Sequence, residues 1–280
     1  MDSFVFAAVL FAAACHAGWN AFIKFGLEPF TTTALIAIAS GVVAVPFMLG
    51  LGLPASASIP YLVASMALHL GYYVGLAEAY RAGDMGQVYP IARGSAPLMT
   101  AVGASLLGEQ LAPLGWAGIA LLAAGIFLLS LRGGRDLATL DRRAVGFALF
   151  TAVTIAGYSL VDGVGARLSG NAHAYTAALF VGDGIMMAII ALLRRGSAVV
   201  IEMARYWKSG LAGGTLSLVA YGIAIWAMTV APIAIVAALR ETSVLFAALI
   251  AVAVLKEPLR APRIAAAFLI VAGLAVIRLH

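Results

Sequence analysis

Residues 11–26, FAAACHAGWNAFIKFG, align without a gap with residues 150–165, FTAVTIAGYSLVDGVG. The 139-residue offset places the Ala-Gly pair at 17–18 on the pair at 156–157, and Trp19 on Tyr158. A chance alignment of alanine-rich sequence is the alternative, but composition alone does not readily produce matches at glycine and aromatic positions. The alignment therefore predicts an internal repeat.

A second alignment extends the repeat towards the C-terminus. At an offset of 148 residues the identities are Tyr73 and Tyr221, Val88 and Val236, Ser95 and Ser243, Glu109 and Glu257, Leu111 and Leu259, and the Ala-Gly pairs at 124–125 and 272–273. The nine-residue difference between the two offsets predicts an insertion in the second half, which we place in the basic segment 194–208. The predicted repeats are residues 1–135 and 136–280.

The composition predicts that the solvent of these repeats is lipid. Of the 280 residues, 64% are hydrophobic and 10% are charged, with a mean hydropathy of +1.06. An ordinary soluble domain has roughly 45–50% apolar and about 25% charged residues. The excess excludes disordered, collagen-like, disulfide-rich secreted and nucleic-acid-binding proteins, although the pI is about 9.6. The single cysteine, Cys15, permits no internal disulfide and is interpreted as a packing residue.

Continuous apolar runs predict membrane-spanning helices, because a span needs about 20 apolar residues and only helices or closed barrels satisfy their backbone in lipid. Ten runs fit, at residues 3–25, 30–50, 58–80, 85–107, 113–131, 143–165, 173–193, 209–230, 233–255 and 261–279. Segment 194–208 is a candidate short interfacial helix. Five spans in each half force the two halves to enter the membrane from opposite sides. The predicted fold is thus an all-α integral membrane protein with two inverted five-helix repeats around a central cavity.

The loop charges predict the orientation, because Lys and Arg collect in cytoplasmic loops. The odd-numbered connections, which lie on one face of the membrane, carry thirteen Lys and Arg residues, namely Lys24, Arg81, Arg132, Arg135, Arg142, Arg143, Arg194, Arg195, Arg205, Lys208, Lys256, Arg260 and Arg263. The opposite face carries two, Arg167 and Arg278. Both termini are therefore expected outside the cytoplasm.

Two duplicated segments carry a resemblance to a known family. They are GQVYPIARGSAPLMTAVGASLLGEQL at 86–111 and IAIVAALRETSVLFAALIAVAVLKEPL at 233–259, each followed by an Ala/Gly-rich helix. With the ten-span plan they resemble the EamA-type transporters of the drug/metabolite transporter superfamily. The resemblance implies a multi-pass secondary transporter of small metabolites in the cell inner membrane, with bacterial amino-acid exporters, including the aromatic type, as close candidates. Many such relatives keep their termini in the cytoplasm, unlike the orientation predicted from the charges.

Polar side chains at bilayer depth are costly, and in inverted-repeat transporters the substrate site lies near the midplane. The predicted substrate-binding residues are Trp19, Asn20, His69, Tyr73, Tyr89, Arg93, Tyr158, Asp162, Tyr221, Trp226, Arg240 and Glu241. Aromatic rings with a few charges suit a zwitterion that carries an apolar group. We expect Arg93 to bind its carboxylate and Asp162 its ammonium group.

Structural roles are the alternative for several of these residues. His16 and Asn20, one helical turn apart, are also typical of hydrogen bonds between helices. Arg240 and Glu241 are also typical of charges that hold helices together. Asp183, between two glycines, has a functional and a packing interpretation.

The sequence contains no nucleotide-binding G-x-x-x-x-G-K-[ST] loop, which excludes direct coupling to ATP. The transport modes that remain are uniport and exchange for a proton or another solute, with His16, Asp162, Asp183 and Glu241 as candidate proton carriers. An intramembrane enzyme is a weaker hypothesis, because G-x-S-x-G and H-E-x-x-H motifs are missing. A channel is another weaker hypothesis, because no ring of charges or repeated carbonyl filter is visible. We expect no cofactor and no metal, and a monomer suffices because both repeats are in one chain.

Overall fold

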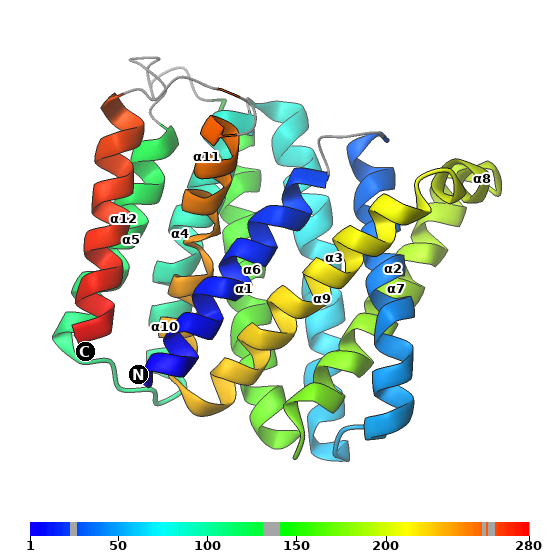
Figure 1. The fold of residues 1–280 in the computed structure, drawn as a ribbon, viewed down its shortest axis with the longest axis horizontal. Coiled ribbons are helices and arrows are strands. Elements are labelled where there is room, and N and C mark those ends of the chain that lie inside the picture. Colours follow the sequence, from blue (N-terminus) through cyan, green and yellow to red (C-terminus); the bar gives the residue numbers. More distant parts are fainter. Residues whose placement is uncertain (23–26, 84, 131–140, 254–255, 257–260, 280) are drawn as a thin grey trace.

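The computed structural model describes all residues except 23–26, 84, 131–140, 254–255, 257–260 and 280 (Figure 1). Across these described ranges the regular structure is entirely helical. The helices are α1 (Ser3–Phe22), α2 (Pro29–Leu51), the 3-10 helix η1 (Ser56–Ser58), α3 (Ile59–Ala82), α4 (Met85–Leu106), α5 (Pro113–Ser130), α6 (Arg142–Leu168), α7 (Ala172–Arg195), α8 (Ala198–Ala204), α9 (Trp207–Val230), α10 (Ile233–Arg240), α11 (Ser243–Ala253) and α12 (Ala261–Leu279).

Most of the helices are long and apolar enough to cross a bilayer. In the described part of the chain there are eight such segments, with a further apolar stretch at Pro113–Leu129 that is shorter. The eight lie in α1, α2, α3, α6, α7, α9, the α10–α11 pair and α12. The chain is therefore a multi-pass membrane protein, and the count of ten spans stays a prediction.

Local sequence explains where several helices begin and end. The Asp141 carboxylate accepts a hydrogen bond from the Arg143 amide at 2.7 Å and so caps the start of α6. The Asn171 side chain does the same for α7, accepting from the amides of His173 at 2.9 Å and Ala174 at 3.2 Å. Gly196, with φ of 68°, ends α7 in a backbone conformation that favours glycine. Caps and glycines therefore set the ends of the helices on either side of the α6–α7 turn.

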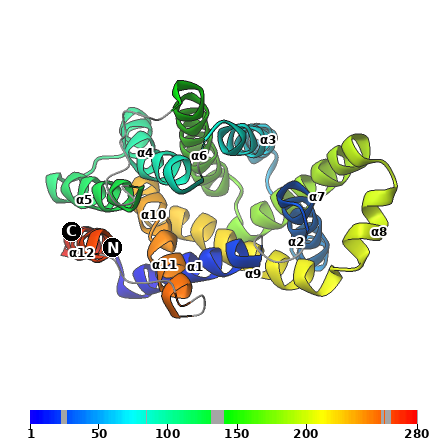
Figure 2. The ribbon, with the colours of Figure 1, turned by 90° about the horizontal axis from the view of Figure 1, so that it is seen from above.

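Seen from above, the helices form an elongated bundle (Figure 2). α5 and α12 lie together at one end, and α2 and α7 lie at the other. α1 and α9 line one long side, α3, α4 and α6 line the other, and α10 lies between the two rows. The bundle therefore packs helices that are far apart in the sequence against one another, such as α5 with α12 and α1 with α9.

Small residues allow the end pairs to pack closely. A Cβ atom at Gly118 of α5 would lie 3.0 Å from the carbonyl oxygen of Gly273 in α12, and one at Gly125 would lie 2.9 Å from that of Ala266. At the other end, a Cβ atom at Gly41 of α2 would lie 3.2 Å from the Cα atom of Gly184 in α7. Close approach of this kind is how helices associate where lipid removes the hydrophobic driving force between them.

The predicted span at 233–255 is not one helix, which corrects the sequence-based expectation. α10 begins after Pro232 and ends at Arg240, and α11 begins at Ser243. Across the break the amides of Glu241 and Thr242 donate at 3.1 Å to the carbonyls of Ala238 and Leu239, three residues earlier, which tightens the last turn. The two residues at the turn, Glu241 and Thr242, are polar but buried, so the break lies inside the bundle.

Figure 1 places the N-terminus and the end of α12 at the lower edge of the bundle and α8 at the upper edge. α8 confirms the short helix predicted within 194–208, with Val199 and Met203 buried against the bundle. Several sequence predictions lie outside the described residues, namely those on Lys24, Gly26, Arg132, Arg135, Glu257, Leu259, Arg260 and the repeat boundary at 135–136.

Candidate functional site

Among the residues that the structure describes, five charged side chains are buried in the middle of the bundle. They come from α4, α6, α7, the end of α10 and the turn that follows it. Their residues are between 0% and 7% exposed: Arg93, Asp162, Asp183, Arg240 and Glu241. Charges in an apolar interior are costly unless they are paired and hydrogen-bonded. Their placement therefore indicates a polar centre inside the protein and away from lipid.

Arg93 and Glu241 form the tightest ion pair of this centre. The Nη1 atom of Arg93 lies 3.2 Å from Oε1 and 3.1 Å from Oε2 of Glu241. Its Nη2 atom lies 2.9 Å from Nε2 of His16 in α1, and its guanidinium lies 5.2 Å from the ring centroid of Tyr89. Arg93 thus ties α1 and α4 to the turn between α10 and α11.

His16 receives two donors, one on each ring nitrogen. The Trp19 indole N–H donates to Nδ1 at 3.3 Å, and the Arg93 guanidinium faces Nε2. A neutral imidazole accepts at one nitrogen, and an imidazolium accepts at none. Both ring nitrogens of His16 therefore face donors, of which a neutral imidazole can accept one, and its role as a proton carrier stays a prediction.

Arg240 lies among aromatic rings and is only partly hydrogen-bonded. Its Nη2 atom lies 3.4 Å from the Tyr158 hydroxyl, 3.2 Å from Ser159 Oγ and 3.6 Å from Glu241 Oε1. The guanidinium carbon lies 5.4 Å from the Tyr158 ring centroid and 5.2 Å from that of Tyr221. Its Nε atom is buried and has no hydrogen-bond partner among the described residues. One donor of this buried cation is therefore unused.

Asp162 of α6 is held by two tyrosine hydroxyls. Tyr175 donates to Oδ1 at 3.0 Å and Tyr221 donates to Oδ2 at 2.5 Å. Sequence reasoning missed Tyr175 and Ser159. The short α6–α7 turn contained a signal for Tyr175, because the hairpin brings it against Gly165, where an added Cβ atom would lie 2.6 Å from the tyrosine oxygen. From there the hydroxyl reaches Asp162, about one helical turn away.

His69 of α3 and Asp183 of α7 form a second buried pair. His69 Nδ1 lies 3.0 Å from Asp183 Oδ2, and the imidazole lies 4.5 Å from the Tyr158 ring and 5.8 Å from the Tyr221 ring between centroids. Asp183 Oδ1 has no hydrogen-bond partner in the described part of the chain. The two tyrosines thus connect this pair to Arg240 and Asp162.

Three predicted residues lie beside this centre and do not join its ion pairs. The Asn20 side chain donates to the His16 carbonyl of its own helix at 2.8 Å. Tyr73 packs edge-on against Tyr72 at 5.4 Å between ring centroids. Trp226 packs against Phe4 at 6.0 Å. The other predicted residues meet in one continuous set of contacts, so in this conformation the polar groups are each other's partners.

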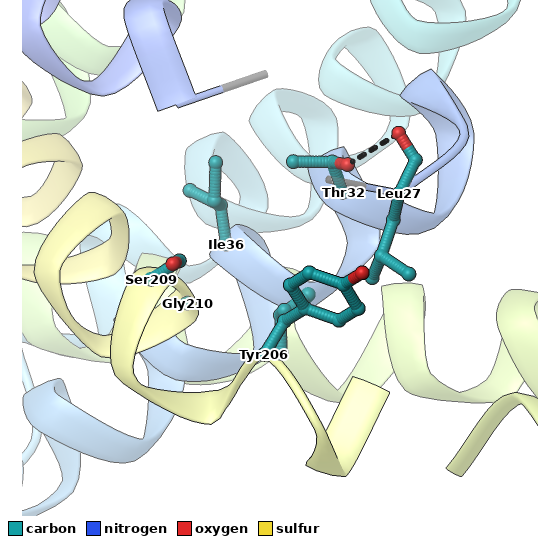
Figure 3. Close-up of a pocket in the computed structure, with 7 residues that line it drawn as sticks. Leu27, Thr32, Ile36, Tyr206, Ser209 and Gly210 are labelled. Atoms are coloured by element: carbon teal, nitrogen blue, oxygen red, sulfur yellow. Dashed lines mark hydrogen bonds between the residues drawn. The ribbon is translucent and has the colours of Figure 1, made fainter. Parts of the chain in front are cut away.

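Figure 3 shows a pocket elsewhere, between the start of α2 and the start of α9. The Thr32 hydroxyl in it donates to the Leu27 carbonyl at 3.2 Å. No ionisable side chain other than the tyrosine phenol lines it, and its residues are Leu27, Thr32, Leu35, Ile36, Tyr206, Ser209 and Gly210. It is separate from the buried charges, and the central cavity that we predicted stays a prediction.

The chain is similar to known proteins in fold and, over its second part, in sequence. One crystal structure of another protein superimposes on 99% of this chain and 96% of its own, with a TM-score of 0.77 and 21% sequence identity, which shows the fold alone. No curated protein matches the sequence. The model of the EamA-like transporter family matches residues 142–279, from the start of α6 to the end of α12. The second part of the chain, residues 142–279, is therefore similar to the EamA-like transporter family.

Proposed function

We propose that this chain is a secondary transporter of the drug/metabolite type that moves small organic metabolites across the cell inner membrane by alternating access. We further propose that amino acids with aromatic or other apolar side chains are its substrates and that it exports them. The transporter-family domain supports the first proposal. The buried centre, with aromatic rings between groups of both charges, supports the second.

The observation that carries this proposal is that both predicted repeats contribute to the buried centre. Arg93 belongs to the first repeat and Glu241 to the second, and they are 148 residues apart, which equals the offset of the second sequence alignment. Two equivalent residues can touch only near the axis that relates the repeats. Their ion pair therefore supports an inverted repeat whose axis passes through the centre of the bundle.

The α5–α12 pair supports the same relation. Gly118 faces Gly273, and Gly125 faces Ala266, so the two helices run antiparallel. Adding 148 to 118 and to 125 gives 266 and 273. Each contact is thereby turned into the other, as a two-fold axis requires. Rocking one repeat against the other would open the buried centre to either side in turn.

Substrate binding in this proposal replaces contacts within the protein. Asp162 exchanges its tyrosine hydroxyls for the substrate ammonium group, and the tyrosine rings contact the apolar part. For the carboxylate, Arg93 would have to release Glu241. His16, Asp162, Asp183 and Glu241 stay candidate proton carriers, with Asp183 favoured by its contact with His69.

Counterflow in proteoliposomes tests the function. Purified protein is reconstituted with an unlabelled amino acid inside, and uptake of the same radiolabelled amino acid is measured for a panel of aromatic, aliphatic and small side chains. We expect trans-stimulated uptake of the apolar members, absent from protein-free liposomes. Uptake without trans-stimulation would indicate a channel, and uptake of other metabolites alone would contradict amino-acid transport. Uptake that is insensitive to a collapsed pH gradient would favour uniport.

A further inference from the structure

We infer that the break between α10 and α11 is a carboxylate-binding subsite, formed by the Arg240 guanidinium and the Ser243 hydroxyl, and that it receives the carboxylate of the transported solute. The inference rests on the proposed function, and it assigns the carboxylate to Arg240 in place of Arg93.

Arg240 is the buried cation with an unused donor. Its residue is 3% exposed, and its Nε atom has no partner in the described ranges. Its nearest carboxylate oxygen, in Glu241, is 3.6 Å away, beyond ordinary hydrogen-bond distance. An unsatisfied buried donor on a charged group is destabilising, and an anionic ligand at this point would supply the missing partner.

The guanidinium of Arg93, unlike that of Arg240, already has close partners within the protein. Its Nη1 atom contacts both oxygens of Glu241, and its Nη2 atom faces His16. A substrate carboxylate at Arg93 would have to leave the Glu241 carboxylate in the interior without its main partner. Arg93 is therefore a positioning residue, which holds Glu241 so that the second guanidinium stays incompletely neutralised.

The helix break supplies a second unused donor. Ser243 is the first residue of α11, an 11-residue helix, and its Oγ atom is buried without a hydrogen-bond partner among the residues described. The amino end of a helix carries a partial positive charge that favours anions. Two unpartnered buried donors thus flank the same two-residue turn, and interrupted membrane helices are typical of solute sites.

Local charge also favours an anion at this break. The guanidinium groups of Arg93 and Arg240 share the single carboxylate of Glu241. The carboxylate of Asp162 accepts a hydrogen bond from the Tyr221 hydroxyl, and the Tyr221 ring lies beside Arg240. A second carboxylate at the break would balance the charge, with the rings of Tyr158 and Tyr221 next to its apolar substituent.

Binding of three matched probes to the purified full-length protein tests the inference. L-phenylalanine, 3-phenylpropanoate and 2-phenylethylamine share one ring and differ in which charges they carry, and L-leucine serves as an aliphatic amino acid. We expect both aromatic carboxylates to bind, and Arg240→Gln to weaken their affinity by about tenfold or more, because a hydrogen bond to a charged group is lost. The affinity for 2-phenylethylamine should not fall. Ser243→Ala should weaken the carboxylates by a smaller factor.

Matched variants separate the possible outcomes. Arg167→Gln, a substitution at a cation outside the buried centre, should leave all affinities unchanged. If Arg240→Gln does not fold, Arg240→Lys and Ser243→Ala decide, and undiminished carboxylate binding in both overturns the inference. Amino-acid binding that is indifferent to Arg240 overturns the inference alone and leaves the transporter proposal standing. Arg240-dependent binding of 3-phenylpropanoate, without binding of either amino acid, supports the subsite and contradicts the proposed amino-acid substrate.

Discussion

Arg93 and Glu241 show how a buried charge pair both stabilises and constrains this protein. Each is nearly inaccessible to solvent, and the contact joins α4 to the α10–α11 turn. Taking two charges out of water is costly, and the cost is recovered only while both partners are present. The pair is therefore a sensitive point for folding as well as for transport.

A double-mutant cycle measures that coupling. We expect Arg93→Met to lower the free energy of unfolding by about 3–5 kcal/mol, because Glu241 then lacks its main buried partner. The double variant with Arg93→Met and Glu241→Leu should recover much of this loss, since no unpaired carboxylate remains. Thermal unfolding in detergent, followed by tryptophan fluorescence, measures the difference. Additive losses from the two single variants would contradict a direct pair.

Asp162 offers a test of the proposed ammonium site. Asp162→Asn keeps the shape of the side chain and one oxygen that accepts a tyrosine hydroxyl, so we expect folded protein. Loss of the negative charge should reduce amino-acid counterflow by about tenfold or more. The control is 3-phenylpropanoate, which lacks the ammonium group and should bind the variant as well as the parent. Equal counterflow of amino acids by both proteins would remove Asp162 from the site.

Among the elements, the closest helix pairs depend on positions where a side chain does not fit. A Cβ atom at Gly125 would meet the backbone of α12, whereas one at Gly146, on α6, has nothing within 4 Å. The two glycines are therefore matched in residue type and differ in surroundings.

We expect Gly125→Ala to lower the melting temperature, because α5 and α12 must move apart. Gly146→Ala should leave it unchanged or raise it, since alanine has a helix propensity about 1 kcal/mol better than glycine. Fluorescence-detected size exclusion after heating compares the two variants. A more stable Gly125→Ala protein would contradict the close packing of this pair.

Glu109, in the turn after α4, ties three elements of the second half together. Its Oε1 atom accepts a hydrogen bond from Arg167 at 2.7 Å, and its Oε2 atom accepts from the Ile233 amide, which begins α10, at 2.9 Å. Arg167 also donates through Nε to the Met228 carbonyl of α9 at 2.9 Å. The turn thus caps α10 and joins it to the ends of α6 and α9.

The cap should contribute more than the partly exposed ion pair. We expect Glu109→Ala to cost about 1–2 kcal/mol, as for a lost helix cap with a weak ion pair. Glu109→Gln keeps an oxygen for the Ile233 amide and should cost less than about 1 kcal/mol. Thermal unfolding of both variants at low and high salt checks this, and equal losses would assign the effect to the ion pair.

For the molecule as a whole, the loop charges predict an orientation that reporter fusions can check. The N-terminus and the end of α12 lie on one side of the bundle, opposite α8. From the Lys and Arg bias we expect both termini outside the cytoplasm. Alkaline phosphatase fused after His280 should be active, and green fluorescent protein at the same point should be dark. The opposite result would reverse the orientation and place the basic loops outside.

Composition and periodicity were sufficient to predict an all-helical membrane protein and to single out the charges that are buried. Both follow from local physics, because lipid requires a helix wherever an apolar run is long enough, and a charge within such a run needs a partner. The repeat offset also placed Arg93 and Glu241 at equivalent positions. Pairing between them could not be read from the alignment, which compares positions and does not measure distances.

The tertiary structure decided the partners. Asp162 and Tyr221 are 59 residues apart, and Arg93 and Glu241 are 148 apart. No spacing rule therefore predicts that Tyr221 binds Asp162, or that Glu241 lies closer to Arg93 than to the adjacent Arg240. The break at Glu241 was not predicted, because four polar residues at 240–243 within a longer apolar run do not show whether the helix continues through them. Hydrophobicity acts on each segment separately, whereas pairing of buried charges depends on which helices meet.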